Sequence, residues 1–287
     1  MSTIERARAL TGYDEVSRLR QAQDLDWVLD LAPAAPSSLA DLGCGTGTLL
    51  AAALERWPEL VRAVGVDGAA SRVDEAARRL GADADVRRGD LLSLEDAGER
   101  FDVITSTSVL HWLHPDERRT LAWVAAHLRP GGAFLLTTHH PHPERDGLGA
   151  EDAVALEALA ALGAEGVVSG TPSPASGVEA LRGVVPMSVR ARPAEAIHAL
   201  LSEVLDVDAI EERYVTVETA GAAEYAAFHA STFGTYFSRL VPEGEQERFF
   251  AAVGEAAWRR QRERGAVYPI TVRLWRARPR TPARAPR

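Results

Sequence analysis

The sequence predicts an α/β protein with a doubly wound, mostly parallel sheet of seven strands, the last antiparallel, and a helical cap. Up to about residue 138, short apolar segments alternate with amphipathic segments of helical period. Strands separated by helices of about 10–15 residues are typical of βαβ units. Beyond that point the alternation stops, and aromatic-rich helices separate the last two expected strands.

The elements of the first half follow one another regularly. A helix with Leu25, Val28 and Leu29 on one face precedes the first strand. The Pro-Gly-Gly sequence from Pro130 to Gly132 is expected to end the helix that begins near Pro115. The expected strands are 37–45, 63–67, 84–90, 101–108 and 133–138, and the helices between them begin near Thr46, Ser71 and Pro115.

The second half is less regular, and we expect it to supply the cap. Its expected elements are helices at 151–162, around 197–204, at 222–240 and at 244–263, and strands at 209–219 and 267–277. We expect one domain over residues 1–287, with a cofactor-binding core at about 13–138 and cap insertions at about 139–208 and 220–266. A disordered tail is expected at about 278–287.

Composition excludes several classes of protein. With 46% hydrophobic and 25% charged residues, the chain of 287 residues is globular. The lone Cys44 excludes a disulfide framework and a Cys-based zinc site. The net charge of −9 disfavours a nucleic-acid partner, and no apolar run approaches the roughly 20 residues of a membrane span. Without a recognisable signal peptide, we expect a cytoplasmic monomer or homodimer that acts on a small molecule.

The clearest motif is LADLGCGTG, in which a strand leads into a G-x-G-x-G turn that opens a helix. Such glycines let a ligand approach the backbone at a helix N-terminus. A dinucleotide fingerprint would require a sixth-position glycine, but residue 48 is Thr. Asp41 would repel a pyrophosphate and attract an ammonium and a sulfonium group. The charge therefore favours S-adenosylmethionine over NAD, although turn chemistry alone could explain the glycines.

Two further motifs lie where the next strands are expected to end. Asp67 stands 20 residues after Gly47, where an acid can bind ribose hydroxyls. Gly89, Asp90 and Leu91 follow the third strand; this carboxylate can accept from an adenine amino group, and the leucine can pack on the ring. Since carboxyl ends of neighbouring parallel strands share one edge, these motifs predict a single ligand site.

In this order, the motifs resemble those of the class I S-adenosylmethionine-dependent methyltransferases, which have a Rossmann-like fold. The matching segments are DLGCGTG, VGVD, RRGDL, FDVITSTSVLHW and LRPGGAFLL, within residues 37–138. The resemblance implies S-adenosylmethionine as cofactor and S-adenosylhomocysteine as product. The cofactor residues that it implies are Asp41, Gly43, Cys44, Gly45, Asp67, Gly68, Gly89, Asp90, Leu91, Ser106 and Thr107. Family members often carry Asn at the position of Thr107.

The second half is more loosely similar to the trans-aconitate and juvenile-hormone-acid methyltransferase branch. The similarity lies in VLHW after the fourth strand, in the late aromatic helices, and in Tyr13 followed by Arg20 and Gln21. In this fold a first helix often covers the cofactor, so the resemblance gives Tyr13 a catalytic role and Arg20 and Gln21 a substrate-binding role. No residue pattern indicates a carboxylate acceptor.

Histidines at the expected ligand edge are candidates for a general base, because their unperturbed pKa lies at roughly 6.5. His111 follows the fourth strand beside Trp112, a candidate substrate-binding residue; the pair could equally be packing aromatics. His139 and His140 follow the fifth strand, the first as a candidate base and the second as a substrate contact. The run could instead be a solvated loop. We expect no metal there, because no acidic partner motif stands beside it.

Aromatic side chains of the late helices are candidates to line the acceptor site, although aromatics at helical spacing are usually core. The candidates are Phe228, Phe233, Tyr236 and Phe237. We expect direct methyl transfer to oxygen or an activated carbon of a small, largely apolar specialised metabolite, with aromatic acceptors among the candidates. N-methylation, carboxylate O-methylation and cofactor binding without methyl transfer are the alternatives.

Overall fold

A computed structural model describes residues 25–96, 98–143, 148–164, 181, 184–265 and 268–280. Tyr13, Arg20 and Gln21 lie outside the described residues. The chain divides into two compact units, which are described separately. The sheet unit comprises Leu25–Thr138, Arg192–Glu212 and the chain from Arg273 on, and the helical unit comprises His139–Ala191 and Arg213–Val272. The expected arrangement of one domain with two cap insertions stays a prediction.

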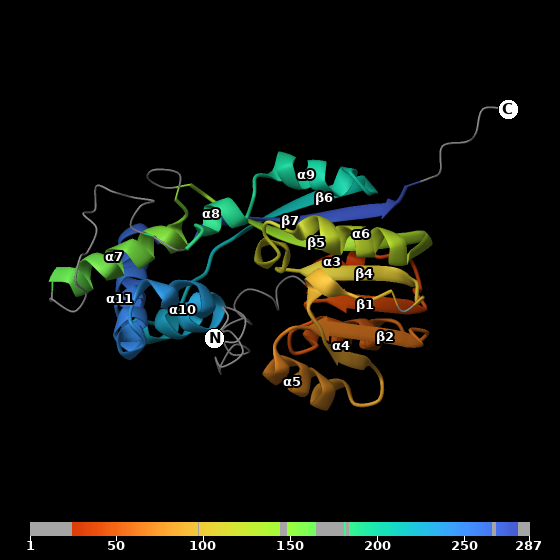
Figure 1. The fold of residues 1–287 in the computed structure, drawn as a ribbon, viewed down its shortest axis with the longest axis horizontal. Coiled ribbons are helices and arrows are strands. Elements are labelled where there is room, and N and C mark those ends of the chain that lie inside the picture. Colours follow the sequence, from red (N-terminus) through yellow and green to blue (C-terminus); the bar gives the residue numbers. More distant parts are fainter. Residues whose placement is uncertain are drawn as a thin grey trace. The chain divides into compact units, whose positions relative to one another are not determined.

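A seven-stranded sheet organises the sheet unit, in the order β3-β2-β1-β4-β5-β7-β6 (Figure 1). The strands are β1 (Ser38–Leu42), β2 (Arg62–Asp67), β3 (Asp85–Arg88), β4 (Phe101–Thr107), β5 (Leu128–Pro141), β6 (Leu205–Val215) and β7 (Ile270–Pro279). The pairs β1–β2, β1–β4, β2–β3 and β4–β5 are parallel. The predicted seven-stranded, mostly parallel sheet is therefore confirmed.

The strand order places a topological switch point between β1 and β4. From β1 the chain proceeds to β2 and β3 on one side, and it returns to β4 and β5 on the other. Connections on the two sides of such a point diverge and leave a crevice at the carboxyl ends of the strands. The glycine turn after β1, Asp67 at the end of β2 and Asp90 after β3 lie at this edge.

Helices cover both faces of the sheet unit, and alternate strand residues face them. They are α3 (Leu25–Asp30), α4 (Thr48–Arg56), α5 (Ala70–Leu80), α6 (Glu117–His127) and α9 (Ala194–Ser202), with short 3₁₀ turns η1 (Leu91–Ser93) and η2 (Leu110–Trp112). Val64 and Val66 of β2 join one hydrophobic core with buried residues of α6 and α9. Gly65, between them, faces α4, where an added Cβ would lie 2.8 Å from Cδ1 of Leu50. Burial of both faces explains the continuously apolar strands.

Tertiary packing changes two expectations. The expected first cap insertion included α9, but α9 belongs to the sheet unit, since Ile197, Leu200 and Leu201 pack into the sheet's core. Strand β5 begins at Leu128, which pairs with Phe101, five residues before the expected start at 133. The Pro-Gly-Gly sequence therefore lies inside an irregular stretch of β5, and it does not merely end a helix.

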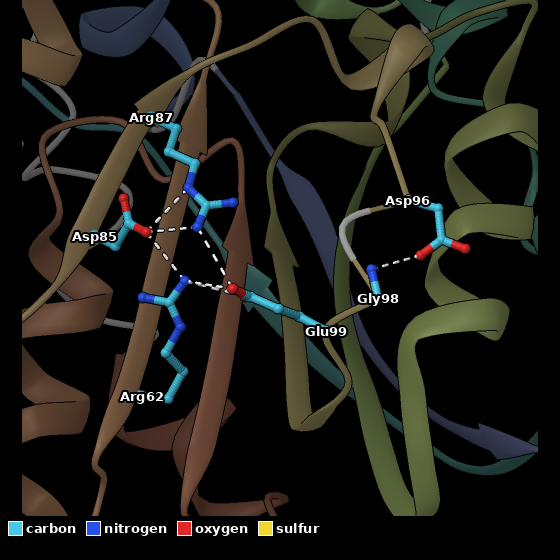
Figure 2. Close-up of polar contacts among 6 residues, drawn as sticks. All are labelled: Arg62, Asp85, Arg87, Asp96, Gly98 and Glu99. Carbon is cyan, nitrogen blue, oxygen red and sulfur yellow. Dashed lines mark hydrogen bonds and ion pairs between the residues drawn. The ribbon is translucent and has the colours of Figure 1, made fainter.

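Charged side chains join the amino ends of β2 and β3 to the segment before β4. Figure 2 shows Arg62 and Arg87 converging on Asp85 and Glu99. The Arg62 Nη2 lies 3.0 Å from Asp85 Oδ2 and 2.8 Å from Glu99 Oε1. Hydrogen bonding from Arg87 lowers the pKa of Asp85 against the opposing effect of burial. All four side chains are partly exposed, so we expect the network to add modestly to stability.

Asp102 at the start of β4 connects three strands at the same amino edge. Its Oδ2 accepts from the backbone N–H of Ser37 (2.9 Å) and of Ser38 (3.1 Å) and from Nη1 of Arg129 (3.1 Å). Burial would raise its pKa, but the Ser37, Ser38 and Arg129 hydrogen bonds outweigh burial and lower it. The Asp102 carboxylate thus holds together the amino ends of β1, β4 and β5, at the edge of the sheet opposite the expected ligand site.

The helical unit contains α7 (Ala150–Ala164), α8 (Met187–Arg190), α10 (Ala222–Phe237) and α11 (Gln246–Arg264), with 3₁₀ turns η5 (Ser238–Leu240) and η6 (Glu243–Glu245). Helix α11 packs against α7 and α10. At Gly254 of α11 an added Cβ would lie 2.3 Å from the carbonyl oxygen of Ala222, so only glycine permits this close crossing. No helix among the described residues has the length and apolar character to cross a bilayer.

We predict that Asp102→Ala lowers the free energy of unfolding by about 1–3 kcal/mol, because the N–H groups of Ser37 and Ser38 lose their acceptor. Since the folded pKa is depressed, the contribution is full above the unfolded pKa of about 3.9 and disappears as pH falls through the folded value. Urea unfolding between pH 7 and 3 should show that the difference in unfolding free energy between wild type and Asp102→Ala narrows at the acid end of this range. The exposed Asp83→Ala is the control; equal losses in both variants would contradict the assignment.

Candidate functional site

The turn after β1 is fixed to β2 by backbone hydrogen bonds. The N–H groups of Gly43 and Cys44 donate to the carbonyl oxygen of Val66, at 2.7 and 3.1 Å. Gly43 has φ +81°, and an added Cβ would lie 2.3 Å from Cγ2 of Val109. This position therefore requires glycine for both its backbone conformation and its space.

The second half of the turn rests on α5. Gly47, with φ +79°, precedes α4, and a Cβ there would lie 2.8 Å from Cδ1 of Leu80. From the last turn of α5, Nη1 of Arg79 donates to the carbonyl oxygen of Thr46 (2.8 Å) and to Oγ1 of Thr48 (2.7 Å). Sequence reasoning missed Arg79, because no local pattern pairs it with a turn 31–33 residues earlier.

Asp67, at the end of β2, uses both carboxylate oxygens to position backbone. Its Oδ2 accepts from the N–H of Gly45 (3.0 Å), and its Oδ1 accepts from the N–H of Ala69 (2.8 Å). The residue is 7% exposed. Each carboxylate oxygen has a second lone pair, so hydrogen bonds to a ribose remain feasible.

Asp41 is a buried carboxyl beside the same turn. It is 1% exposed, and Oγ1 of Thr105 donates to its Oδ1 at 2.8 Å. Burial raises its pKa to about 7; the Thr105 hydrogen bond lowers it, and the charge of Asp67 raises it further. Burial and the charges of Asp41 and Asp67 also raise the pKa of the Cys44 thiol, which disfavours its thiolate form.

The end of β3 presents the third predicted part of the site. The N–H of Gly89 donates to the backbone carbonyl of Asp67 at 3.0 Å, which links the ends of β2 and β3. Oδ1 of Asp90 accepts from the N–H of Leu92 at 3.0 Å and so starts η1. Asp90 is exposed and Leu91 is buried, and their contacts with adenine stay a prediction.

The end of β4 shows local strain. Ser106 uses its hydroxyl within the sheet, donating to the carbonyl oxygen of Leu42 at 3.1 Å, and Thr107 is half-buried. Ser108 adopts φ +59°, and its N–H donates to Oγ1 of Thr137 at 3.0 Å. A non-glycine residue held in this region is costly and is often found at functional edges. Sequence reasoning missed Ser108.

His111 and Trp112 lie in η2, just after β4, and both are half-buried. Their ring centroids are 4.9 Å apart. His114, by contrast, lies 3.3 Å from Oε1 of the buried Glu117, which also binds Nε of Arg192 at 2.7 Å. His114 thus lies beside the structural Glu117–Arg192 ion pair, while His111 remains the candidate base of the sheet unit.

Among the residues that the structure describes, the acceptor candidates other than Trp112 belong to the helical unit. His139 and His140 lie inside β5, and not after it as expected, because the strand continues to Pro141. His139 is buried and His140 half-buried. The aromatic candidates are all buried in the helical unit: Phe228, Phe233, Tyr236 and Phe237. Their roles, like those of all the site residues, stay predictions.

The helical unit also holds a buried polar network that sequence reasoning missed. Nδ1–H of the buried His229 donates to the carbonyl oxygen of Tyr225 at 2.7 Å, and Tyr268 Oη donates to Nε2. Burial lowers the pKa of His229 to about 4, so the ring is neutral. Tyr225 Oη donates to the carbonyl of Val217 at 2.9 Å. Because these groups are paired, the network is structural.

The donors and acceptors of the sheet unit fit S-adenosylmethionine. Asp41 offers negative charge to a cationic methionine end, and Asp67 offers hydrogen-bond acceptors to a ribose. Asp90 offers an acceptor to the edge of a base, and Leu91 offers an apolar side chain to its face. Among the described residues no group of three or more His, Cys, Asp or Glu side chains could hold a metal ion.

Comparison with known proteins agrees with this geometry. Residues 39–132 match the family model described as a methyltransferase domain. Trans-aconitate 2-methyltransferase of Deinococcus radiodurans is 34% identical over 128 residues, 44% of this chain and 47% of that protein. Indolepyruvate C-methyltransferase of Streptomyces griseus is 38% identical over 84 residues, 28% of this chain and 25% of that protein.

The fold is shared with more distant proteins. Phosphoethanolamine N-methyltransferase 2 of Haemonchus contortus, solved with S-adenosylhomocysteine, superposes with a TM-score of 0.58 at 14% identity, over 98% of this chain and 61% of that chain. The chain spans about half or less of the length of the two sequence relatives named above. The family model likewise matches only part of the chain, residues 39–132.

We predict that Gly43→Ala abolishes tight binding of S-adenosylhomocysteine. An alanine at positive φ costs roughly 1–2 kcal/mol, and the overlap with Val109 forces the turn to move. Gly81→Ala is the matched control, because Gly81 also has positive φ (+57°) but has open space at its Cβ. Calorimetric titration should show binding near wild type for Gly81→Ala; equal binding by Gly43→Ala would show that the turn does not position the ligand.

Proposed function

We propose that the chain, whose residues 39–132 form a class I S-adenosylmethionine-dependent methyltransferase domain, methylates a small, largely apolar specialised metabolite, aromatic acceptors included. The acceptor atom is an oxygen or an activated carbon. The observation that carries the proposal is the alignment of Asp41, Asp67 and Asp90 at the carboxyl edge of adjacent strands. S-adenosylmethionine is the cofactor that this edge fits.

The cofactor supplies an already activated methyl group, so the chain contributes alignment and exclusion of water. In this proposal the turn with Gly43 and Gly45 contacts the methionine end, Asp67 the ribose, and Asp90 with Leu91 the adenine. His111 or His139 removes the acceptor's proton where the acceptor is an alcohol or a carbon acid. The half-buried position of His111 beside β4 supports the first of these.

The named relatives suggest two kinds of acceptor. One relative is named for trans-aconitate, which suggests carboxylate O-methylation, and the other for C-methylation of indolepyruvate. A carboxylate acceptor needs little help from a base, whereas a carbon acceptor needs one. We favour O- or C-methylation of an aromatic or apolar acceptor, because the helical unit that holds most of the acceptor candidates is rich in buried aromatic rings.

The first experiment is calorimetric titration with S-adenosylhomocysteine. We predict that Asp67→Ala loses at least about tenfold in affinity, since hydrogen bonds to a charged group contribute about 1.5–3 kcal/mol. Thermal unfolding must accompany it, because the variant also leaves the Gly45 N–H without its acceptor. The exposed Asp74→Ala is the control. Absence of wild-type binding at millimolar ligand would refute the proposal.

Methyl transfer is tested separately, with labelled S-adenosylmethionine and either trans-aconitate or indolepyruvate. Label in trans-aconitate would favour the carboxylate alternative, and label in indolepyruvate would favour C-methylation. Tight cofactor binding without transfer in a wider set of alcohols, phenols and amines would favour a cofactor-binding protein of the same fold.

We predict that binding of S-adenosylmethionine releases protons near pH 7. The raised pKa of Asp41, about 7, means that the free protein holds this carboxyl partly protonated. Ionising it costs folded-state stability as pH rises through that value, and a cationic ligand offsets the cost. Affinity should therefore rise between pH 6 and 8, most steeply near the pKa of about 7. Titration in buffers of different ionisation enthalpy measures the release; Asp41→Asn should abolish it, and an unchanged release would assign it elsewhere.

A further inference from the structure

The turn that follows β4 combines a strained residue with a buried hydrogen-bond acceptor. Ser108, the first residue after the strand, adopts φ +59°, a conformation that is unfavourable for a residue with a Cβ. Its N–H donates to Oγ1 of Thr137 at 3.0 Å. Thr137 lies in β5 and is 2% exposed. Since Ser108 alone would relax to another conformation, the surrounding fold must stabilise this turn.

The position of the Thr137 hydroxyl is fixed by the sheet. Strand β5 pairs with β4 in parallel register, with Ser106 opposite Leu136 and Thr107 opposite Thr137. The pairing therefore continues up to the residue before Ser108. A hydroxyl oxygen can accept the Ser108 N–H, whereas a methyl group in its place could not. The Thr137 bond thus favours the left-handed conformation of Ser108 over the extended one.

The next residue, Val109, packs against the glycine turn that follows β1. At Gly43 an added Cβ would lie 2.3 Å from Cγ2 and 3.2 Å from Cγ1 of Val109, so the valine occupies the space beside that glycine. Val109 is half-buried and packs against the core of the sheet unit. Because the backbone direction after Ser108 depends on the φ of Ser108, the Thr137 bond determines where the Val109 side chain lies.

The glycine turn is consequently held from two sides. On the side of β2, backbone hydrogen bonds join it to the end of that strand. On the side of β4 the contact is apolar and depends on Val109. The Trp112 N–H donates to the carbonyl oxygen of Val109 at 2.8 Å, so η2, which carries His111, starts from the same residue. Val109 therefore connects the glycine turn to the segment with the candidate base.

We propose that Thr137 is a positioning residue for the cofactor site. Its hydroxyl holds Ser108 in the left-handed conformation, which keeps Val109 against Gly43 and the glycine turn in the geometry that binds the methionine end of S-adenosylmethionine. The inference rests on the proposed function, which assigns the glycine turn to that cofactor. A turn that is rigid before the ligand arrives reduces the entropy lost on binding.

Calorimetric titration with S-adenosylhomocysteine tests the role of the hydroxyl. Thr137→Val keeps the shape of the side chain and removes the acceptor. We expect the Kd to rise about fivefold or more, since without the bond the left-handed conformation of Ser108 is disfavoured by a factor of roughly ten.

Thr138→Val is the matched control on the same strand. The Thr138 Oγ1 accepts from Nε1 of the buried Trp275 at 2.7 Å, so this variant loses a buried hydrogen bond of the same kind without involving Ser108. It should lower the Tm by about 2–4 °C and leave the Kd within about twofold of wild type.

A glycine substitution at Ser108 separates positioning from a general loss of stability. Glycine adopts positive φ without a steric penalty, so Ser108→Gly should leave the Tm unchanged or raise it. The double variant Thr137→Val, Ser108→Gly should bind S-adenosylhomocysteine within about twofold of Ser108→Gly alone, because glycine keeps the turn without the hydrogen bond. A Thr137 that only stabilises the fold would not be rescued in this way.

Wild-type affinity in Thr137→Val, an equal loss of affinity in Thr138→Val, or no recovery in the double variant would overturn the positioning role. A clear fall of the Tm in Ser108→Gly would also overturn it, and that measurement does not require Thr137→Val to fold. Failure of the wild type to bind S-adenosylhomocysteine would instead overturn the proposed function, so the two failures are distinguishable.

Discussion

The hydrogen bond from the Gly45 N–H to Asp67 is the contact on which the whole cofactor edge depends. It holds the turn after β1 against the end of β2, and the backbone carbonyl of Asp67 accepts from Gly89 to hold the end of β3. The loops after neighbouring parallel strands have no ladder of their own to align them. One residue therefore aligns three loops before any ligand arrives, which reduces the entropy that binding must overcome.

Asp41, unlike Asp67, destabilises the free protein when it is ionised. Its burial beside Asp67 is unfavourable whenever it ionises, and the Thr105 hydroxyl compensates only in part, as its raised pKa records. An asparagine would fold with less penalty but would offer no charge. An ionised acid that is poorly stabilised in the free protein is stabilised strongly when a cation binds beside it. The burial that lowers the stability of the free protein therefore raises its affinity and selectivity for a positively charged ligand.

The cofactor edge could be predicted from the sequence because its causes are local: glycines at a turn and acids at strand ends. The remainder depends on partners distant in the chain. Pro130 indicates a stop, yet pairing of Leu128 with Phe101 decides that a strand begins there. The bond between Tyr268 and His229 joins residues 39 positions apart, and no periodicity marks it. Asp152, similarly, is an ordinary first-turn acid until its burial is known.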